Sequence, residues 1–117
     1  MIPFPASLQA AFEAPGTFAF QVEAEHPAFA DHFPGRPLLP GVVQVDWALR
    51  LGRRVYGEMG TFEALEHLKF QAPILPGEPI SLRLDWAPAK GELAFEYWGN
   101  QGRKSSGFAR FAPAQPA

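Results

Sequence analysis

The segment from Val42 to Tyr56 constrains the fold of this chain more than any other stretch. It is long enough for a helix, and its first turns are apolar on most sides, which is typical of a helix buried inside a domain. Pro40 suits the first helical turn, because its missing N–H is not needed there. We therefore expect a buried helix that begins around Gly41 and ends before Gly57. Its strongly polar positions are Gln44, Asp46, Arg50, Arg53 and Arg54.

Elsewhere the sequence alternates between apolar and polar residues with the period of β-strands. A short amphipathic helix over Ser7–Glu13 is expected before the first strand. One strand before the long helix and four after it predict an α+β domain in which an antiparallel sheet wraps the helix. Five strands leave a sheet edge and part of the helix exposed, so we expect a homodimer. The predicted strands span residues 17–25, 65–71, 80–86, 93–98 and 103–111.

The composition is that of one domain, since 117 residues with 47% hydrophobic content supply a single core. We expect residues 1–117 to form it, with an ordered core over about 17–111, a short N-terminal segment and a disordered Pro/Ala-rich tail. A formal net charge of -2 argues against nucleic-acid binding. The lack of cysteine excludes disulfides, thiolate metal sites and thiol nucleophiles.

No signal peptide is recognisable, and no run approaches the ~20 apolar residues that span a bilayer. We therefore expect a soluble, cytoplasmic protein. His26 and His67 have no partner at metal-ligand spacing, so no metal site is expected.

A histidine and a carboxylate flank the expected start of the long helix. His32 lies in a Gly/Pro-rich turn, and Asp46 follows fourteen residues later. Histidine suits general-base work near neutral pH, and a desolvated carboxyl group suits general-acid work. Between them, the first turn around Gly41 directs backbone N–H groups at any ligand above the helix end, as an oxyanion site requires.

Each of these residues also has a structural interpretation. Arg50 lies four residues after Asp46, so an ion pair on one helical face would satisfy both charges and keep the carboxylate ionised, against the acid role. His32 also fits a hydrogen-bonded residue of a turn, and Gly41 a plain turn residue. These alternatives stay open at the level of sequence.

The segment His32-Phe-Pro-Gly-Arg-Pro-Leu-Leu-Pro-Gly-Val-Val-Gln-Val-Asp46 resembles the signature of the 3-hydroxyacyl-acyl-carrier-protein dehydratases, the FabA/FabZ-type hot-dog-fold enzymes of fatty acid synthesis. The match includes the histidine, both Pro-Gly pairs and the carboxylate at the same offset. The segment Leu68–Gly77 is similar to the strand that follows the helix in that family, so the resemblance covers most of residues 17 to 111.

Some positions distinguish branches of that family. The turn around His32 is similar to the FabZ type, whereas aspartate at position 46 is typical of the FabA type and does not by itself imply isomerase activity. Arg50 stands where members commonly carry glutamine, and Trp47 replaces a small residue. The pattern through Trp47 is closer to the ApeI-like branch of aryl-polyene biosynthesis.

The resemblance implies the hot-dog fold and reversible dehydration of a 3-hydroxyacyl thioester, linked to acyl carrier protein, to a trans-2-enoyl thioester. It implies fatty acid or aryl-polyene biosynthesis as the setting, with no metal and no organic cofactor. His32 would take a proton from the carbon next to the thioester carbonyl, the Gly41 N–H would stabilise the enolate-like oxygen, and Asp46 would protonate the departing hydroxyl. In the family the histidine and the carboxylate that meet in one site come from opposite subunits, which implies a homodimer; a higher oligomer or a heterodimer is also compatible.

Two other functions stay open. A hot-dog thioesterase would use Asp46 to activate water or attack the thioester, although such enzymes usually lack the turn around His32. A non-catalytic acyl-binding subunit is favoured if Arg50 holds Asp46.

Two further groups of residues are candidates for binding. Candidates for an acyl tunnel, which ordinary core packing also explains, are Phe33, Leu38, Leu39, Val42, Val45 and Trp47. Candidates for docking an acidic carrier protein, with a solvated face as the alternative, are Arg36, Arg50, Arg53, Arg54, Arg103 and Lys104.

Overall fold

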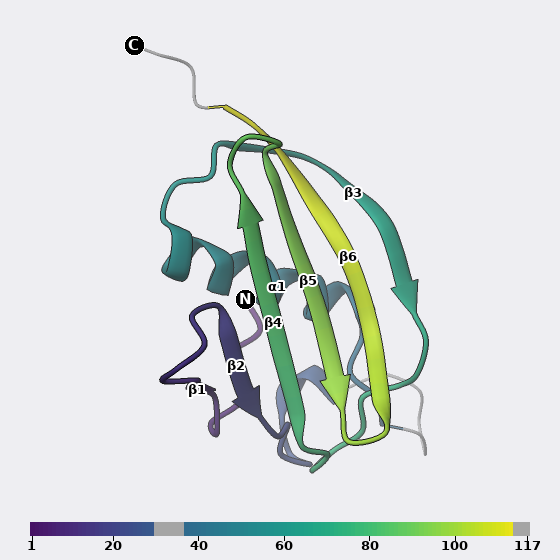
Figure 1. The fold of residues 1–117 in the computed structure, drawn as a ribbon. Helices are drawn as coiled ribbons and strands as arrows, with labels where there is room; N and C mark the ends of the chain where they lie inside the picture. The colour runs from purple at the N-terminus through teal and green to yellow at the C-terminus, as the bar shows by residue number, and fades with distance from the viewer. Residues whose placement is uncertain (30–36, 114–117) are drawn as a thin grey trace.

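The computed structural model describes residues 1–29 and 37–113. Within them a six-stranded sheet covers one long helix, α1 (Gly41–Tyr56) (Figure 1). A short 3-10 helix, η1 (Pro27–Phe29), precedes α1 in the sequence. All neighbouring strands are antiparallel, in the order β1-β2-β4-β5-β6-β3. The predicted α+β layout is confirmed. The strands are β1 (Gln9–Ala10), β2 (Thr17–Phe20), β3 (Thr61–Phe70), β4 (Ile80–Ala87), β5 (Glu92–Gly99) and β6 (Gly102–Ala112).

The core lies between one face of α1 and the inner face of the sheet. Alternate side chains of β4, β5 and β6, such as Leu82, Phe95 and Ala109, point at the helix and are buried. Gly52 permits close packing there, because a β-carbon at that position would lie 2.7 Å from Cδ2 of Leu93. The buried face of the helix consists of Val43, Gln44, Val45, Trp47, Ala48, Leu51 and Gly52.

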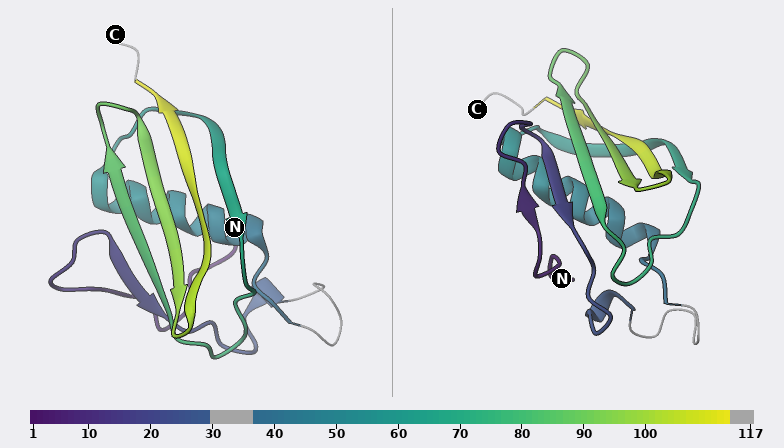
Figure 2. Two further views of the ribbon diagram at one scale, coloured as in Figure 1. Left: turned by 45° about the vertical axis from the view of Figure 1, so that its right-hand side comes forward. Right: turned by 60° about the horizontal axis from the view of Figure 1, so that its bottom comes forward.

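The opposite face of α1 is exposed, so the prediction of a helix buried on most sides is wrong for a single chain. Val42 is 77% exposed, and Arg53, Arg54 and Val55 also face outward. Figure 2 shows the reason: the helix crosses behind the sheet, which covers it from one side only. In residues 1–29 and 37–113 no helix is long and apolar enough to cross a membrane.

Strand β3 stands at the edge of the sheet and is mostly exposed. Among the described residues it pairs only with β6, and the register shifts between Glu66 and Lys69, where His67 has a φ of 53°. Its large apolar side chains are between 36% and 52% exposed. We call these residues the β3 stripe: Phe62, Leu65, Leu68 and Phe70.

Two predictions for the N-terminal region are wrong. Residues 7–13 contain strand β1 and turns instead of a helix, since a short isolated helix is only marginally stable, whereas β1 is held by pairing with β2. The sheet therefore has six strands in the described residues, where five were predicted. Strand β2 ends at Phe20, not at Glu25, because the chain then turns to bury His26 against Trp47 of α1.

Candidate active site

The first turn of α1 places Gly41 at the end of the helix, beside a hollow. The N–H groups of Val43 and Gln44 both donate to the Pro40 carbonyl, at 3.1 Å. No acceptor for the N–H of Gly41 is found among the described residues. The helix end therefore offers a backbone donor where its dipole favours negative charge.

The hollow lies between the start of α1 and the end of β3, and its volume is about 450 Å³. The ring of Phe70 covers Gly41 so closely that a β-carbon there would lie 2.8 Å from the ring. The space beside the α-carbon of Gly41 is thus already occupied by a side chain of the same subunit. The hollow is lined by Leu38, Leu39, Gly41, Gln44, Phe70, Gln71, Ala72 and Pro73.

Asp46 lies on the same helix, and its side chain is 44% exposed. The Nε of Arg50 donates to Asp46 Oδ2 at 3.0 Å, and Nη2 lies 2.9 Å from the same oxygen. The ion pair that the four-residue spacing allows is therefore present. The other oxygen, Oδ1, has no hydrogen bond to any described residue.

A buried polar network holds α1 to the sheet below this region. The Gln44 side-chain amide donates to the Leu39 carbonyl at 3.1 Å, while its Oε1 accepts from Ser105 Oγ at 2.6 Å. The Tyr97 hydroxyl donates to the Gln44 carbonyl, also at 2.6 Å. Burial, followed by the negative charge of Asp46, raises the pKa of Tyr97 well above its ordinary value.

This network is not predicted by the sequence motifs. A usable signal existed, because Gln44 is a polar residue on the buried face of a helix and such residues need buried partners. The partner could not be named, since Ser105 lies 61 residues away in sequence.

Comparisons with known proteins identify the family. The family model described as ApeI-like, ApeI dehydratase, matches residues 10–108. This chain belongs to the ApeI-like dehydratase family. A solved structure described as the dehydratase heterocomplex ApeI:P from Xenorhabdus doucetiae is 30% identical with a TM-score of 0.76, and the match covers 94% of this chain and 97% of that one.

Two further relatives agree with this family. An uncharacterised protein from Erwinia carotovora subsp. atroseptica is 33% identical with a TM-score of 0.73, over 96% of this chain and 94% of that one. The 3-hydroxyacyl-(acyl-carrier-protein) dehydratase FabZ of Natranaerobius thermophilus is 29% identical over 79 residues, 62% of this chain and 56% of the relative. This chain thus spans about half the length of the curated relatives that it matches. The hot-dog fold is confirmed.

In this ApeI-like chain, the predicted site residues other than Gly41 and Asp46 lie in several environments. Leu38 and Leu39 line the hollow beside Gly41, whereas Val45 and Trp47 pack in the core and Val42 is exposed. His32, Phe33 and Arg36 lie outside the described residues. Of the predicted docking residues, Arg53 and Arg54 are exposed, while Arg50, Arg103 and Lys104 form ion pairs with Asp46, Glu96 and Glu78.

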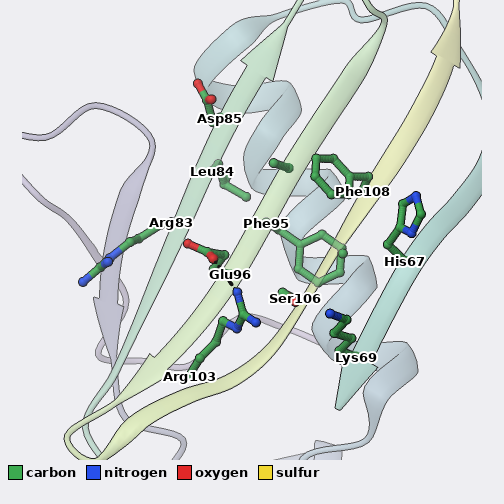
Figure 3. A pocket seen from close by; sticks show the side chains of 12 residues that line it. His67, Lys69, Arg83, Leu84, Asp85, Phe95, Glu96, Arg103, Ser106 and Phe108 are labelled. Atoms are coloured by element: carbon green, nitrogen blue, oxygen red, sulfur yellow. Dashed lines mark hydrogen bonds and ion pairs between the residues drawn. The ribbon is translucent and has the colours of Figure 1, made fainter. Parts of the chain in front are cut away.

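A second hollow, of about 340 Å³, lies on the face of the sheet opposite α1 (Figure 3). Its lining includes Arg103, which donates to Glu96 at 3.0 Å and to Gln71 at 2.9 Å. Arg83 lies 4.7 Å above the ring of Trp98. Arg103 and Arg83 already have partners, and none of the described residues of the His32–Asp46 segment lines this hollow, so the candidate active site remains at α1.

Proposed function

We propose that this protein dehydrates 3-hydroxyacyl thioesters, carried on acyl carrier protein, to trans-2-enoyl thioesters. The observation that carries the proposal is the placement of two motif residues in an ApeI-like chain. Gly41 opens a hollow at the N-terminal end of α1, and Asp46 follows on the same helix with one carboxylate oxygen available.

In the proposed reaction, His32 removes a proton from the carbon next to the thioester carbonyl. Negative charge then develops on the carbonyl oxygen, where the Gly41 N–H stabilises it. The bond from carbon 3 to the hydroxyl breaks, and a proton delivered through Asp46 completes the departing water. The acyl chain would extend past Leu38 and Leu39, and the exposed Arg53 and Arg54 would contact the acidic carrier.

We further propose that the active unit is a homodimer joined along β3. The unpaired edge of β3, its apolar stripe and the exposed Val42 on α1 together support this, because each leaves apolar or backbone groups uncovered in one chain. His32 of one subunit would then complete a site with Gly41 and Asp46 of the other.

One observation favours a second candidate function, that of an acyl-binding partner subunit. Arg50 occupies Asp46 Oδ2, so one oxygen of the proposed catalytic carboxylate is already engaged by a cation of the same helix. A similar solved structure is described as a heterocomplex. Under this alternative the chain would bind acyl groups and leave the chemistry to a paralogous subunit.

Turnover of a 3-hydroxyacyl thioester by wild type, His32→Ala and Asp46→Asn tests the proposal. Enoyl absorbance that appears with wild type and is lost in both variants supports the dehydratase. Asp85→Asn is the matched control, since Asp85 is exposed on β4. Release of free thiol and acid would indicate a thioesterase, and acyl binding without turnover would indicate the partner subunit.

A further inference from the structure

Arg50 is held by three groups at once, and its side chain is only 18% exposed. Its guanidinium contacts Asp46 Oδ2 through Nε and Nη2. Nη2 also donates to the carbonyl of Ile2, and the guanidinium carbon lies 4.2 Å from the centre of the Phe4 ring. The cation that meets the proposed catalytic carboxylate is therefore oriented by residues near the N-terminus.

The segment Ile2–Phe4 is itself fixed on α1 by aromatic residues. Trp47 Nε1 donates to the Ile2 carbonyl at 3.4 Å, and the Phe4 ring lies 6.3 Å from the Trp47 ring. His26 bonds the Pro3 carbonyl through Nε2 at 2.9 Å, while its Nδ1 accepts from the Ala28 N–H at 3.0 Å. Because Nδ1 accepts, Nε2 is the ring nitrogen that donates to the Pro3 carbonyl. The segment is thus anchored at each of its residues.

This anchoring fixes the orientation of the Asp46 carboxylate. Both Arg50 donors go to one oxygen, Oδ2, and the other oxygen accepts no hydrogen bond from the described residues. Without the ring of Phe4 and the carbonyl of Ile2, the flexible arginine side chain would lose its fixed direction, and the carboxylate would no longer be held in one orientation.

We propose that Arg50 and Phe4 are positioning residues of the dehydration: the segment Ile2–Phe4 fixes the Arg50 guanidinium, which holds the Asp46 carboxylate in one orientation and so presents its second oxygen to the substrate hydroxyl. This inference rests on the proposed function. Neither residue touches the reacting atoms, and both act through Asp46. A misdirected carboxylate slows proton delivery without weakening acyl binding, so the effect falls on kcat.

Substitutions at Phe4 test the inference, with thermal unfolding used to verify that each variant is folded. Phe4→Leu removes the aromatic face and keeps an apolar side chain, whereas Phe4→Tyr keeps the face. Phe4 also contacts Arg54, whose guanidinium carbon lies 4.7 Å from the ring centre, so the assay uses a coenzyme A thioester, with which no carrier docks. We expect Phe4→Leu to lower kcat about tenfold with little change in KM, and Phe4→Tyr to retain wild-type kcat. Phe12→Leu is the matched control, because Phe12 is 100% exposed and is not one of the groups that contact Arg50.

A spectroscopic readout separates this inference from the proposed function. The Nε–H proton resonance of Arg50, assigned by its loss in Arg50→Met, should exchange slowly with water in wild type and Phe4→Tyr but rapidly in Phe4→Leu. Equal kcat in wild type and Phe4→Leu, or equal losses in Phe4→Leu and Phe4→Tyr, would overturn the inference. If wild type makes no enoyl product, the proposed function fails, and the Arg50 resonance alone decides whether the segment positions the guanidinium.

Discussion

The ring of Phe70 lies against Gly41, and a β-carbon built on this glycine would come within 2.8 Å of it. Gly41→Ala would therefore displace the ring and narrow the hollow at the helix end. Because Phe70 is 52% exposed and can move outward, we expect a stability change below about 1 kcal/mol. Enoyl formation should fall by about tenfold or more, since the thioester oxygen loses close approach to the Gly41 N–H.

The double variant Gly41→Ala/Phe70→Leu separates ligand access from internal packing. The smaller leucine makes room for the new methyl group, so packing strain should be relieved while activity stays low. Full recovery of enoyl formation in the double variant would mean that Gly41 serves only to accommodate Phe70.

Ser105→Ala tests the buried network between α1 and the sheet. The substitution removes the donor to Gln44 Oε1 and leaves that oxygen buried without it. We expect the free energy of unfolding to fall by about 1–3 kcal/mol in urea titrations. Ser106→Ala is the matched control, because its side chain faces the opposite side of the sheet, and it should change stability by less than about 0.5 kcal/mol. Equal effects of the two substitutions would contradict the network.

The predictable part of this structure is the part governed by local pattern. The helix from Gly41 and the strands after it follow from hydrophobic period, and the Asp46–Arg50 pair follows from four-residue spacing on a helix. Strand β1 could not be predicted, because its two residues are held by pairing with β2 and not by their own propensity. The contact of Phe4 with Arg50 could not be predicted either, since 46 positions separate the two residues and only the fold brings them together.

Tyr97 should make the protein sensitive to alkaline pH. The pKa of Tyr97 is raised in the folded state, chiefly by burial, so above its unfolded value of about 10.0 the unfolded chain releases a proton that the folded chain keeps. Stability is then lost as pH rises past that value, by up to about 1.4 kcal/mol per pH unit. In Tyr97→Phe this alkaline slope should become shallower, as measured by denaturant titration at a series of pH values.

Tyr56→Phe provides the comparison for that slope. The pKa of Tyr56 is also raised, first by burial and then by the charge of Asp85. Tyr56 is less deeply buried than Tyr97, and its hydroxyl donates to the Leu84 carbonyl at 3.0 Å. Its removal should flatten the alkaline slope less than removal of Tyr97. A slope that is unchanged in Tyr97→Phe would show that the tyrosine does not control alkaline unfolding.

Leu65→Lys tests the proposed interface along β3. A lysine in the middle of the β3 stripe would be buried without a partner when two chains pair, so we expect the dimer dissociation constant to rise about 100-fold or more. Sedimentation equilibrium measures this change, and enoyl formation should fall with the dimer fraction. Leu75→Lys is the matched control, because Leu75 is 46% exposed outside the stripe. Identical association of Leu65→Lys and wild type would place the interface elsewhere.

Mixing two inactive variants tests whether each site takes residues from both subunits. A heterodimer of His32→Ala and Asp46→Asn chains has one site with both intact residues and one site with neither. After denaturation and refolding together at equal amounts, half of the dimers are mixed and half of their sites are complete, so about one quarter of wild-type activity should return. Each variant refolded alone should stay inactive. A mixture no more active than its components would mean that His32 and Asp46 of one subunit serve the same site, or that the chain forms no dimer.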